Sequence, residues 1–217
     1  MCLLEKLLRK RCFVVFGDTM SLKSDAKKSR KSKYDISPMF LTRWSPRAMS
    51  GESLTKKELM PIFEAARWAP SSFNGQPWRF LVAHSAKERE LFMSFLNDFN
   101  QAWCKNASAL VILLSRRNFS YNNKPNWHHS FDSGAAWMSC ALEGAKRGLV
   151  VHGMAGFDKK KLIKKMRIPK EFEVNMMFAI GKFGRIKELP ENIAKMEKVS
   201  SRMKLSDVVK FGKFNWK

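Results

Sequence analysis

The sequence predicts an α/β or α+β sandwich in which helices cover a central sheet. Three observations predict this class. From residue 39 onward, short apolar runs of strand length alternate with stretches of helical periodicity. The composition is 45% apolar with 17 Phe and 7 Trp, enough for one sizeable core in 217 residues. No internal repeat interrupts the alternation. A histone-like protein and a disordered basic tail are therefore excluded, despite 41 basic against 19 acidic residues and a net charge of +22.

Residues 1–38 differ from the rest, and we expect a basic N-terminal appendage followed by one domain over residues 39–217. A polar run over residues 21–33 carries six basic residues and one acid. The appendage begins with apolar side chains on one helical face: Leu3, Leu4, Leu7, Leu8 and Cys12. A solvated tail is favoured over docking to a membrane surface or a partner.

The first predicted element of the domain is a helix that begins at a capping box. Thr55 and Glu58 have the Thr-x-x-Glu spacing, which predicts a helix that runs to Trp68. Pro61 falls inside it and favours a later start or a kink. Residues 80–83 then form a short strand.

The middle of the chain alternates in the same way. Residues 86–103 predict one helix, and the unbroken apolar run over residues 109–114 predicts an interior strand. Residues 133–147 are rich in Ala and predict a helix that Gly148 ends. The remaining elements are a strand over 149–151, a Gly-rich turn over 153–156, a helix opened by Asp158 and a strand over 175–180. After Gly184 some thirty polar residues follow, which we expect to wrap a partner subunit.

The four cysteines predict neither a zinc site nor a disulfide framework. They are scattered without a C-x-x-C pair, so we expect reduced thiols. No apolar stretch is long enough to cross a bilayer, and the basic start lacks the apolar core of a signal peptide. A cytoplasmic location is the expectation.

The most informative stretch is Ala-Pro-Ser-Ser-Phe-Asn-Gly-Gln-Pro-Trp at residues 69–78. Two prolines bracket short polar side chains, so the loop is stiff and leaves backbone groups free. It suits a planar ligand rich in heteroatoms, or it is an elaborate turn between a helix and a strand.

Three weaker clusters accompany it. Residues 43–47 place two guanidinium groups and a hydroxyl where they can converge on a phosphate or carboxylate. Residues 153–156 are small enough to let backbone N–H groups approach a ligand. Residues 100–103 bring amide side chains to the end of a helix. Each has a plain alternative: a chance basic pair, a strand-to-helix turn and a helix stop.

In this order and spacing the clusters resemble the nitroreductase family of flavin-dependent oxidoreductases, over roughly residues 38–217. The resemblance implies an α+β three-layer sandwich with a mixed central sheet flanked by helices and a C-terminal arm that wraps a partner subunit. It also implies a homodimer with FMN at the interface.

The resemblance assigns the two polar ends of FMN to five residues. Arg43, Ser45 and Arg202 would hold the phosphate. Arg47 and Asn100 would lie at the pyrimidine edge of the isoalloxazine. A fixed cation there stabilises the negative charge of reduced flavin.

The ring itself would lie along Met154, Ala155 and Gly156, with a backbone N–H of Ala155 or Gly156 directed at N5. Four further residues would reach the flavin of the other subunit: Pro70, Ser71, Ser72 and Asn74. No catalytic acid, base, nucleophile or metal is then needed, because hydride passes from NADH or NADPH through N5 to a flat, electron-poor acceptor such as a nitroaromatic or a quinone.

The chain departs from its relatives at the phosphate. Many relatives carry a second basic residue shortly before the position of Arg202, where this chain has Ser200 and Ser201. Lys198 or Lys204 is expected to substitute. Residues 116–129 fall where the family varies and shapes the acceptor pocket.

Histidines are predicted to be structural. His128 and His129 are adjacent and would point apart on any regular element, so exposed loop histidines are favoured over a metal site. A hydrogen-bonded structural role is favoured for His152 over a place near the flavin ring. Two alternatives to the enzyme remain: a flavin-binding family member without turnover, and a basic protein that binds nucleic acid or an anionic membrane. The lysine runs lack interleaved aromatic residues, so base stacking has no support.

Overall fold

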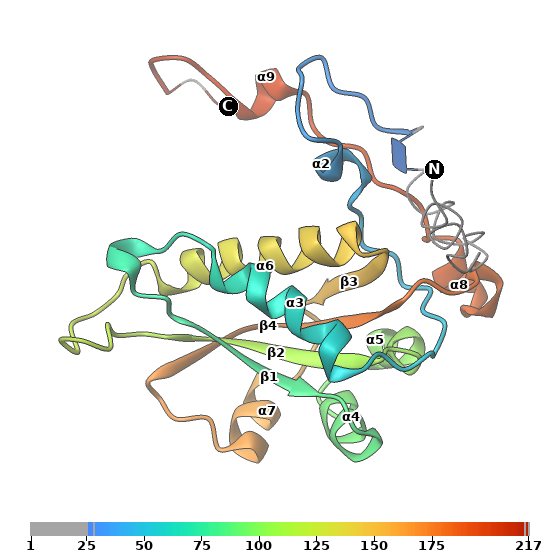
Figure 1. Ribbon diagram of the computed structural model, residues 1–217, viewed down its shortest axis with the longest axis horizontal. Helices are drawn as coiled ribbons and strands as arrows, with labels where there is room; N and C mark the ends of the chain where they lie inside the picture. Colours follow the sequence, from blue (N-terminus) through green and yellow to red (C-terminus); the bar gives the residue numbers. More distant parts are fainter. Residues whose placement is uncertain (1–25, 28, 215, 217) are drawn as a thin grey trace, which may run out of the picture.

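A four-stranded sheet forms the centre of the structure (Figure 1). The computed structural model describes residues 26, 27, 29–214 and 216. Along the sheet the strand order is β1-β2-β4-β3. The strands are β1 Trp78–Ala83, β2 Ala109–Arg116, β3 Leu149–Met154 and β4 Phe172–Lys182. The α+β class is confirmed.

The sheet is antiparallel throughout the described residues, so the expectation of a mixed sheet is wrong. All three strand pairs run antiparallel. Strands β2 and β3, joined by the helix α6 (His129–Lys146), point in the same direction, but β4 lies between them. The helical crossover therefore links two parallel strands that are not neighbours, which the alternation of helix and strand in the sequence does not reveal.

Helices cover both faces of the sheet, giving the expected three layers (Figure 1). On one face α6 packs with α3 (Lys56–Arg67), and on the other lie α4 (Ala86–Met93) and α7 (Lys159–Met166). Strand β2 is buried on both faces, because Leu110 and Ile112 pack in one core cluster while Val111 and Leu113 pack in the other. The unbroken apolar run predicted this position correctly.

Local sequence sets the starts of these helices. Thr55 and Glu58 form the reciprocal hydrogen bonds of a capping box at α3, and Pro61 lies inside that helix without ending it. Asp158 caps α7 by accepting a hydrogen bond from the backbone N–H of Lys161 at 2.9 Å.

The single helix expected over residues 86–103 is two helices. After α4, the chain breaks and restarts as α5 (Asp98–Cys104), capped by Asn97. The break is held by tertiary pairing: Leu96 forms a β-bridge with Phe157, and the Asn97 N–H donates to the Gly156 carbonyl at 3.0 Å. A remote segment thus overrides the helical periodicity.

The segment that precedes the domain and the segment that follows residue 194 run beside each other, away from the sheet (Figure 1). Helix α2 (Pro38–Thr42) precedes the domain, while α8 (Glu191–Ala194) and α9 (Leu205–Val208) follow it; short 3₁₀ turns lie at Ser72–Asn74 and Ile186–Glu188. The closing segment exposes many apolar side chains: Met203, Leu205, Val208, Val209, Phe211 and Phe214. The amphipathic start, with Leu3 to Cys12, lies outside the described residues. Within the described part of the chain, no helix combines the length and the apolar character needed to cross a membrane.

Candidate functional site

A cluster of cationic side chains forms where residues 30–45 meet residues 200–202. Arg43 follows α2 directly, and its Nη1 donates to Ser45 Oγ at 3.1 Å. Arg202 Nη1 donates to Ser200 Oγ at 3.0 Å. Pro46 holds the backbone of Ser45 extended, which keeps the Ser45 hydroxyl beside the Arg43 guanidinium. Arg43, Ser45 and Arg202, which the family resemblance assigns to one phosphate, are thus part of one cluster.

Arg30 joins this cluster and was not predicted. Its Nη1 donates to the carbonyl oxygens of Leu41 at 3.1 Å and Arg43 at 2.7 Å, and its Nε donates to the Ser200 carbonyl at 3.0 Å. Lys198 and Lys204, the expected substitutes for a missing family cation, make no such contact in the described structure. In the sequence Arg30 is one member of a basic run. Its contact with Ser200 joins residues 170 positions apart, and no local sequence motif records such a contact.

We call Arg30, Arg43, Ser45, Ser200 and Arg202 the arginine cradle. Burial and then the charge of Arg202 lower the pKa of Arg43. Burial, Arg202 and Arg43 lower that of Arg30. Among the described residues, no carboxylate forms an ion pair with any of the three arginines. Three guanidinium groups without a counter-charge fit a bound phosphate.

Arg47 lies next to the cradle and is held by Glu197. The Glu197 carboxylate accepts from the backbone N–H of Arg47 at 2.6 Å and of Ala48 at 2.8 Å. Its second oxygen lies 3.7 Å from Arg47 Nη1, and the guanidinium carbon lies 5.7 Å from the centre of the Phe99 ring. Arg47 Nε is buried and has no hydrogen-bond partner among the described residues, so a donor remains for a ligand.

Asn100 is buried on α5 beside the turn after β3. Its amide nitrogen donates to the Gly156 carbonyl at 3.0 Å, and its oxygen accepts from Trp103 Nε1 at 3.2 Å. A Cβ on residue 156 would lie 2.5 Å from the Asn97 amide nitrogen and 2.8 Å from that of Asn100, so only glycine permits this approach. Asn100 and Gly156 are therefore brought together as expected.

His152 connects this turn to the arginine segment. Its Nδ1 is 2.8 Å from the Pro46 carbonyl, and its ring centroid lies 4.5 Å from that of Trp103. Burial lowers the pKa of His152 to about 4, so the ring is neutral at pH 7. The structure supports the expectation of a hydrogen-bonded structural histidine.

Met154 and Ala155 differ in what they present. Met154 is buried, with its sulfur 3.2 Å from the Cys104 thiol, so its side chain belongs to the core. Ala155 is exposed at the end of β3. A ligand along this turn would meet the backbone of Met154 and not its thioether.

The loop of residues 70–74 is anchored to the start of α6. The Ser72 N–H donates to the buried carboxylate of Asp132 at 3.1 Å, and Ser71 Oγ accepts from the Gln76 N–H at 3.0 Å. Phe73 and Asn74 have φ angles of 49° and 51°. Such left-handed backbone is costly for residues other than glycine, and is typical of loops shaped for a ligand.

This loop lies far from the arginine cradle within one chain. It is at the end of the sheet near the start of α6, whereas α5 and α8 lie at the opposite end (Figure 1). Pro70, Ser71, Ser72 and Asn74 are therefore not brought together with Arg43, Asn100 or Gly156 in the monomer.

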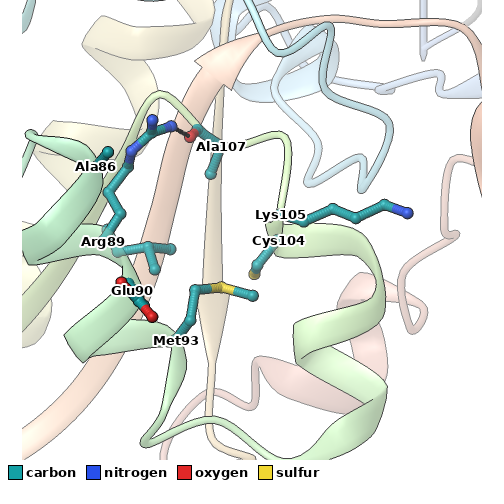
Figure 2. A pocket seen from close by; sticks show the side chains of 8 residues that line it. Ala86, Arg89, Glu90, Met93, Cys104, Lys105 and Ala107 are labelled. Carbon is teal, nitrogen blue, oxygen red and sulfur yellow. Dashed lines mark hydrogen bonds between the residues drawn. The ribbon is translucent and has the colours of Figure 1, made fainter.

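A cavity of about 270 Å³ between α4, α5 and β2 is separate from both parts (Figure 2). Arg89 reaches across its rim and donates to the Ala107 carbonyl at 2.5 Å. No residue of the predicted site lines it; the lining residues are Ala86, Arg89, Glu90, Met93, Cys104, Lys105, Ala107 and Leu110. Burial raises the pKa of the Cys104 thiol well above its usual range, so this thiol is not a nucleophile.

The remaining candidates carry no ligand site. Cys104 and Cys140 are free and buried, and burial raises the pKa of Cys140 to about 12. His129 Nδ1 lies 2.7 Å from Ser115 Oγ, and His128 is exposed. No group of three metal-binding side chains occurs in the described ranges.

Fold and site together define an α+β protein with a cradle of three arginines and a turn of small residues held by a buried amide. A profile described as the nitroreductase family matches residues 41–102. The chain is similar to the crystal structure of an oxidoreductase containing FMN, with 43% identity and a TM-score of 0.83, covering 87% of this chain and 97% of that one.

Curated protein sequences also resemble this chain. Protein DrgA of Synechocystis sp. is 27% identical over 158 residues, which cover 59% of this chain and 74% of DrgA. An oxygen-insensitive NADPH nitroreductase of Helicobacter pylori is 40% identical over 60 residues, and that match covers only 28% of this chain and 28% of the nitroreductase. The chain belongs to the nitroreductase family.

Proposed function

We propose that this protein is an FMN-dependent NAD(P)H oxidoreductase that reduces flat, electron-poor acceptors of the nitroaromatic or quinone type. The observation that carries the proposal is the arginine cradle, whose three guanidinium groups form no ion pair with a carboxylate among the described residues. The contact between Asn100 and Gly156 accompanies it. The similarity at 43% identity to an FMN-containing oxidoreductase supports the cofactor.

In this proposal the phosphate of FMN binds to Arg43, Ser45 and Arg202. Guanidinium groups match the geometry of phosphate oxygens, and the Ser45 hydroxyl that now accepts from Arg43 can donate its own proton to the phosphate. A phosphate dianion would also relieve the repulsion between the arginines.

The flavin ring would extend from the cradle toward α5. Arg47, with its unpartnered Nε, and Asn100 would face the pyrimidine edge. Met154, Ala155 and Gly156 would face the ring through their backbone, with an N–H of Ala155 or Gly156 at N5.

The residues of this chain act mainly by binding and by setting charge. When bound, FMN supplies hydride transfer from NADH or NADPH to the acceptor. The Arg47 guanidinium stabilises negative charge at the pyrimidine edge, and Glu197 orients Arg47 while offsetting part of its charge. His152, which is neutral and packs against Trp103 with the two rings tilted, adds no further charge nearby.

A homodimer would complete the site. Pro70, Ser71, Ser72 and Asn74 are remote from the cradle in one chain, so a second copy would have to bring them to the flavin. The exposed apolar residues after Arg202 offer surface for such an arm. Equilibrium sedimentation of the whole protein tests this: a monomer at micromolar concentration would contradict it.

The acceptor would lie under exposed aromatic side chains near residues 116–129. Tyr121, Trp127 and Phe131 are 62%, 86% and 81% exposed. Flat acceptors stack on such rings. Variants Trp127→Ala and Tyr121→Ala should raise KM for nitroaromatic and quinone acceptors without raising KM for the nicotinamide donor.

The direct test is optical. The purified protein should be yellow, or become so with added FMN, and NADH or NADPH should bleach it without air. Colourless protein that cannot be reconstituted would reject the proposal. Bleaching without turnover of any acceptor would favour the flavin-binding alternative, and retention on a polyanion through high salt would favour the nucleic-acid alternative.

The cytoplasmic location of the protein stays a prediction.

A further inference from the structure

We propose that Arg30 is a positioning residue for the flavin phosphate, through which the N-terminal segment closes the arginine cradle. This rests on the proposed function, because it names a further group for the same phosphate.

Arg30 bridges the two chain segments that carry the expected phosphate ligands. Its side chain donates to the carbonyls of Leu41 and Arg43 on one segment and to the carbonyl of Ser200 on the other. In the described structure, the hydrogen bonds between residues 41–45 and residues 200–202 run through this one guanidinium.

The geometry requires arginine. A guanidinium has five N–H donors in a planar fork. Four are used: Nε on the Ser200 carbonyl, two on Nη1, and one on Nη2 toward Ser200 Oγ at 3.4 Å. One Nη2 donor remains. A lysine has three donors on a single point, so it cannot span both segments in this way.

The partners of Arg30 leave its charge uncompensated. Three of the four are carbonyl oxygens and the fourth is a hydroxyl. The full positive charge of Arg30 therefore adds to those of Arg43 and Arg202. A phosphate monoester carries nearly two negative charges at pH 7, so a third cation beside Arg43 and Arg202 adds to the attraction for it.

Arg30 thus supplies the cation missing before Arg202, from the opposite end of the chain. Phosphate binding should in turn stabilise residues 29–43, since the ligand and the N-terminal segment share the same guanidinium.

The experiment compares FMN with riboflavin, which lacks the phosphate, on the full chain. Affinities are measured by quenching of flavin fluorescence for the unaltered protein, Arg30→Gln, Arg30→Lys and Lys33→Gln. Lys33 is an exposed cation three residues away and serves as the charge-matched control. We expect Arg30→Gln to weaken FMN binding by about tenfold or more, as for a lost charge-assisted contact. Riboflavin affinity should change less than about twofold, since it makes no phosphate contact.

Arg30→Lys should recover only part of the loss, and Lys33→Gln should match the unaltered protein. Hydrogen exchange should show that FMN, more than riboflavin, protects the amides of residues 29–43 in the unaltered protein and not in Arg30→Lys. FMN affinity of Arg30→Gln within threefold of the unaltered protein, or an equal loss for both flavins, would overturn the inference. If Arg30→Gln does not fold, the same criteria apply to Arg30→Lys. Failure of the unaltered protein to bind FMN would instead overturn the proposed function.

Discussion

The carboxylate of Glu197 binds the backbone of Arg47 and faces its guanidinium at once. One oxygen accepts from the Arg47 N–H at 2.6 Å, and the other lies 3.7 Å from Nη1. The Glu197 side chain is 0% exposed. The residue that sets the charge at the proposed pyrimidine edge is thereby fixed by a group 150 residues away.

Replacing Glu197 should weaken both the fold and the control of charge. Glu197→Ala should cost roughly 3 kcal/mol of unfolding free energy, since it leaves a partly buried cation and two backbone N–H groups without their acceptor. Glu197→Gln should cost less and raise the flavin reduction potential, because the charge of Arg47 is no longer offset. Urea unfolding and a redox titration measure these. Glu191→Gln on α8 is the exposed control, and an unchanged potential in Glu197→Gln would contradict the prediction.

Gly156→Ala should disrupt the turn beside the proposed ring. The added Cβ would lie 2.5 Å from the side-chain amide nitrogen of Asn97 and 2.8 Å from that of Asn100, so both side chains must move, at an expected cost of about 1–3 kcal/mol and with weaker binding of both FMN and riboflavin. Gly134→Ala on α6 is the matched control, because nothing lies within 4 Å of its Cβ. That control should stabilise the helix by about 0.5–1 kcal/mol in thermal unfolding. Equal effects of the two substitutions would refute the close-approach argument.

The neutral His152 should make stability depend on acid. Its pKa is about 4 in the folded protein and near 6.5 when unfolded. Below pH 6.5 the unfolded chain therefore binds more protons, so stability is present above that pH and is lost as pH falls toward 4. The loss attributable to this group should approach about 3 kcal/mol.

His152→Asn should remove that part of the pH dependence. Unfolding free energies at pH 7, 5.5 and 4.5 would be compared with those of His128→Asn, an exposed histidine. A slope in His152→Asn as steep as in the unaltered protein would show that other groups cause the acid sensitivity.

Asp132→Asn should loosen the loop of residues 70–74. The buried carboxylate accepts from the Ser72 N–H at 3.1 Å, and its loss removes a charge-assisted hydrogen bond worth about 1.5–3 kcal/mol. If this loop reaches the flavin of the partner, FMN and riboflavin should both bind several-fold less tightly. Asp207→Asn, on α9, is the control. Unchanged binding with lowered stability would place the loop away from the ring.

Much of the fold was readable from the sequence because its signals are local. The capping box at Thr55 and Glu58 and the cap at Asp158 start helices as predicted, and the apolar run of β2 is an interior strand. The 86–103 helix failed, since the pairing of Leu96 with Phe157 breaks it. The mixed sheet that the resemblance implied is wrong, because all three strand pairs are antiparallel, and the direction of pairing depends on which strands become neighbours.

The candidate site divides in the same way. The sequence alone determined the residue types of the stiff 69–78 loop, the Arg43–Ser45 pair and the Asn100 and Gly156 positions, because each is a short motif. Only the tertiary structure decided that Arg30 meets Ser200 and that Glu197 meets Arg47, across 170 and 150 residues. The tertiary structure also decided that the Met154 side chain is buried in the core and that the 70–74 loop lies far from the cradle. Contacts between residues so distant in sequence depend on how the packed layers bring remote segments together, and no local spacing in the sequence records that packing.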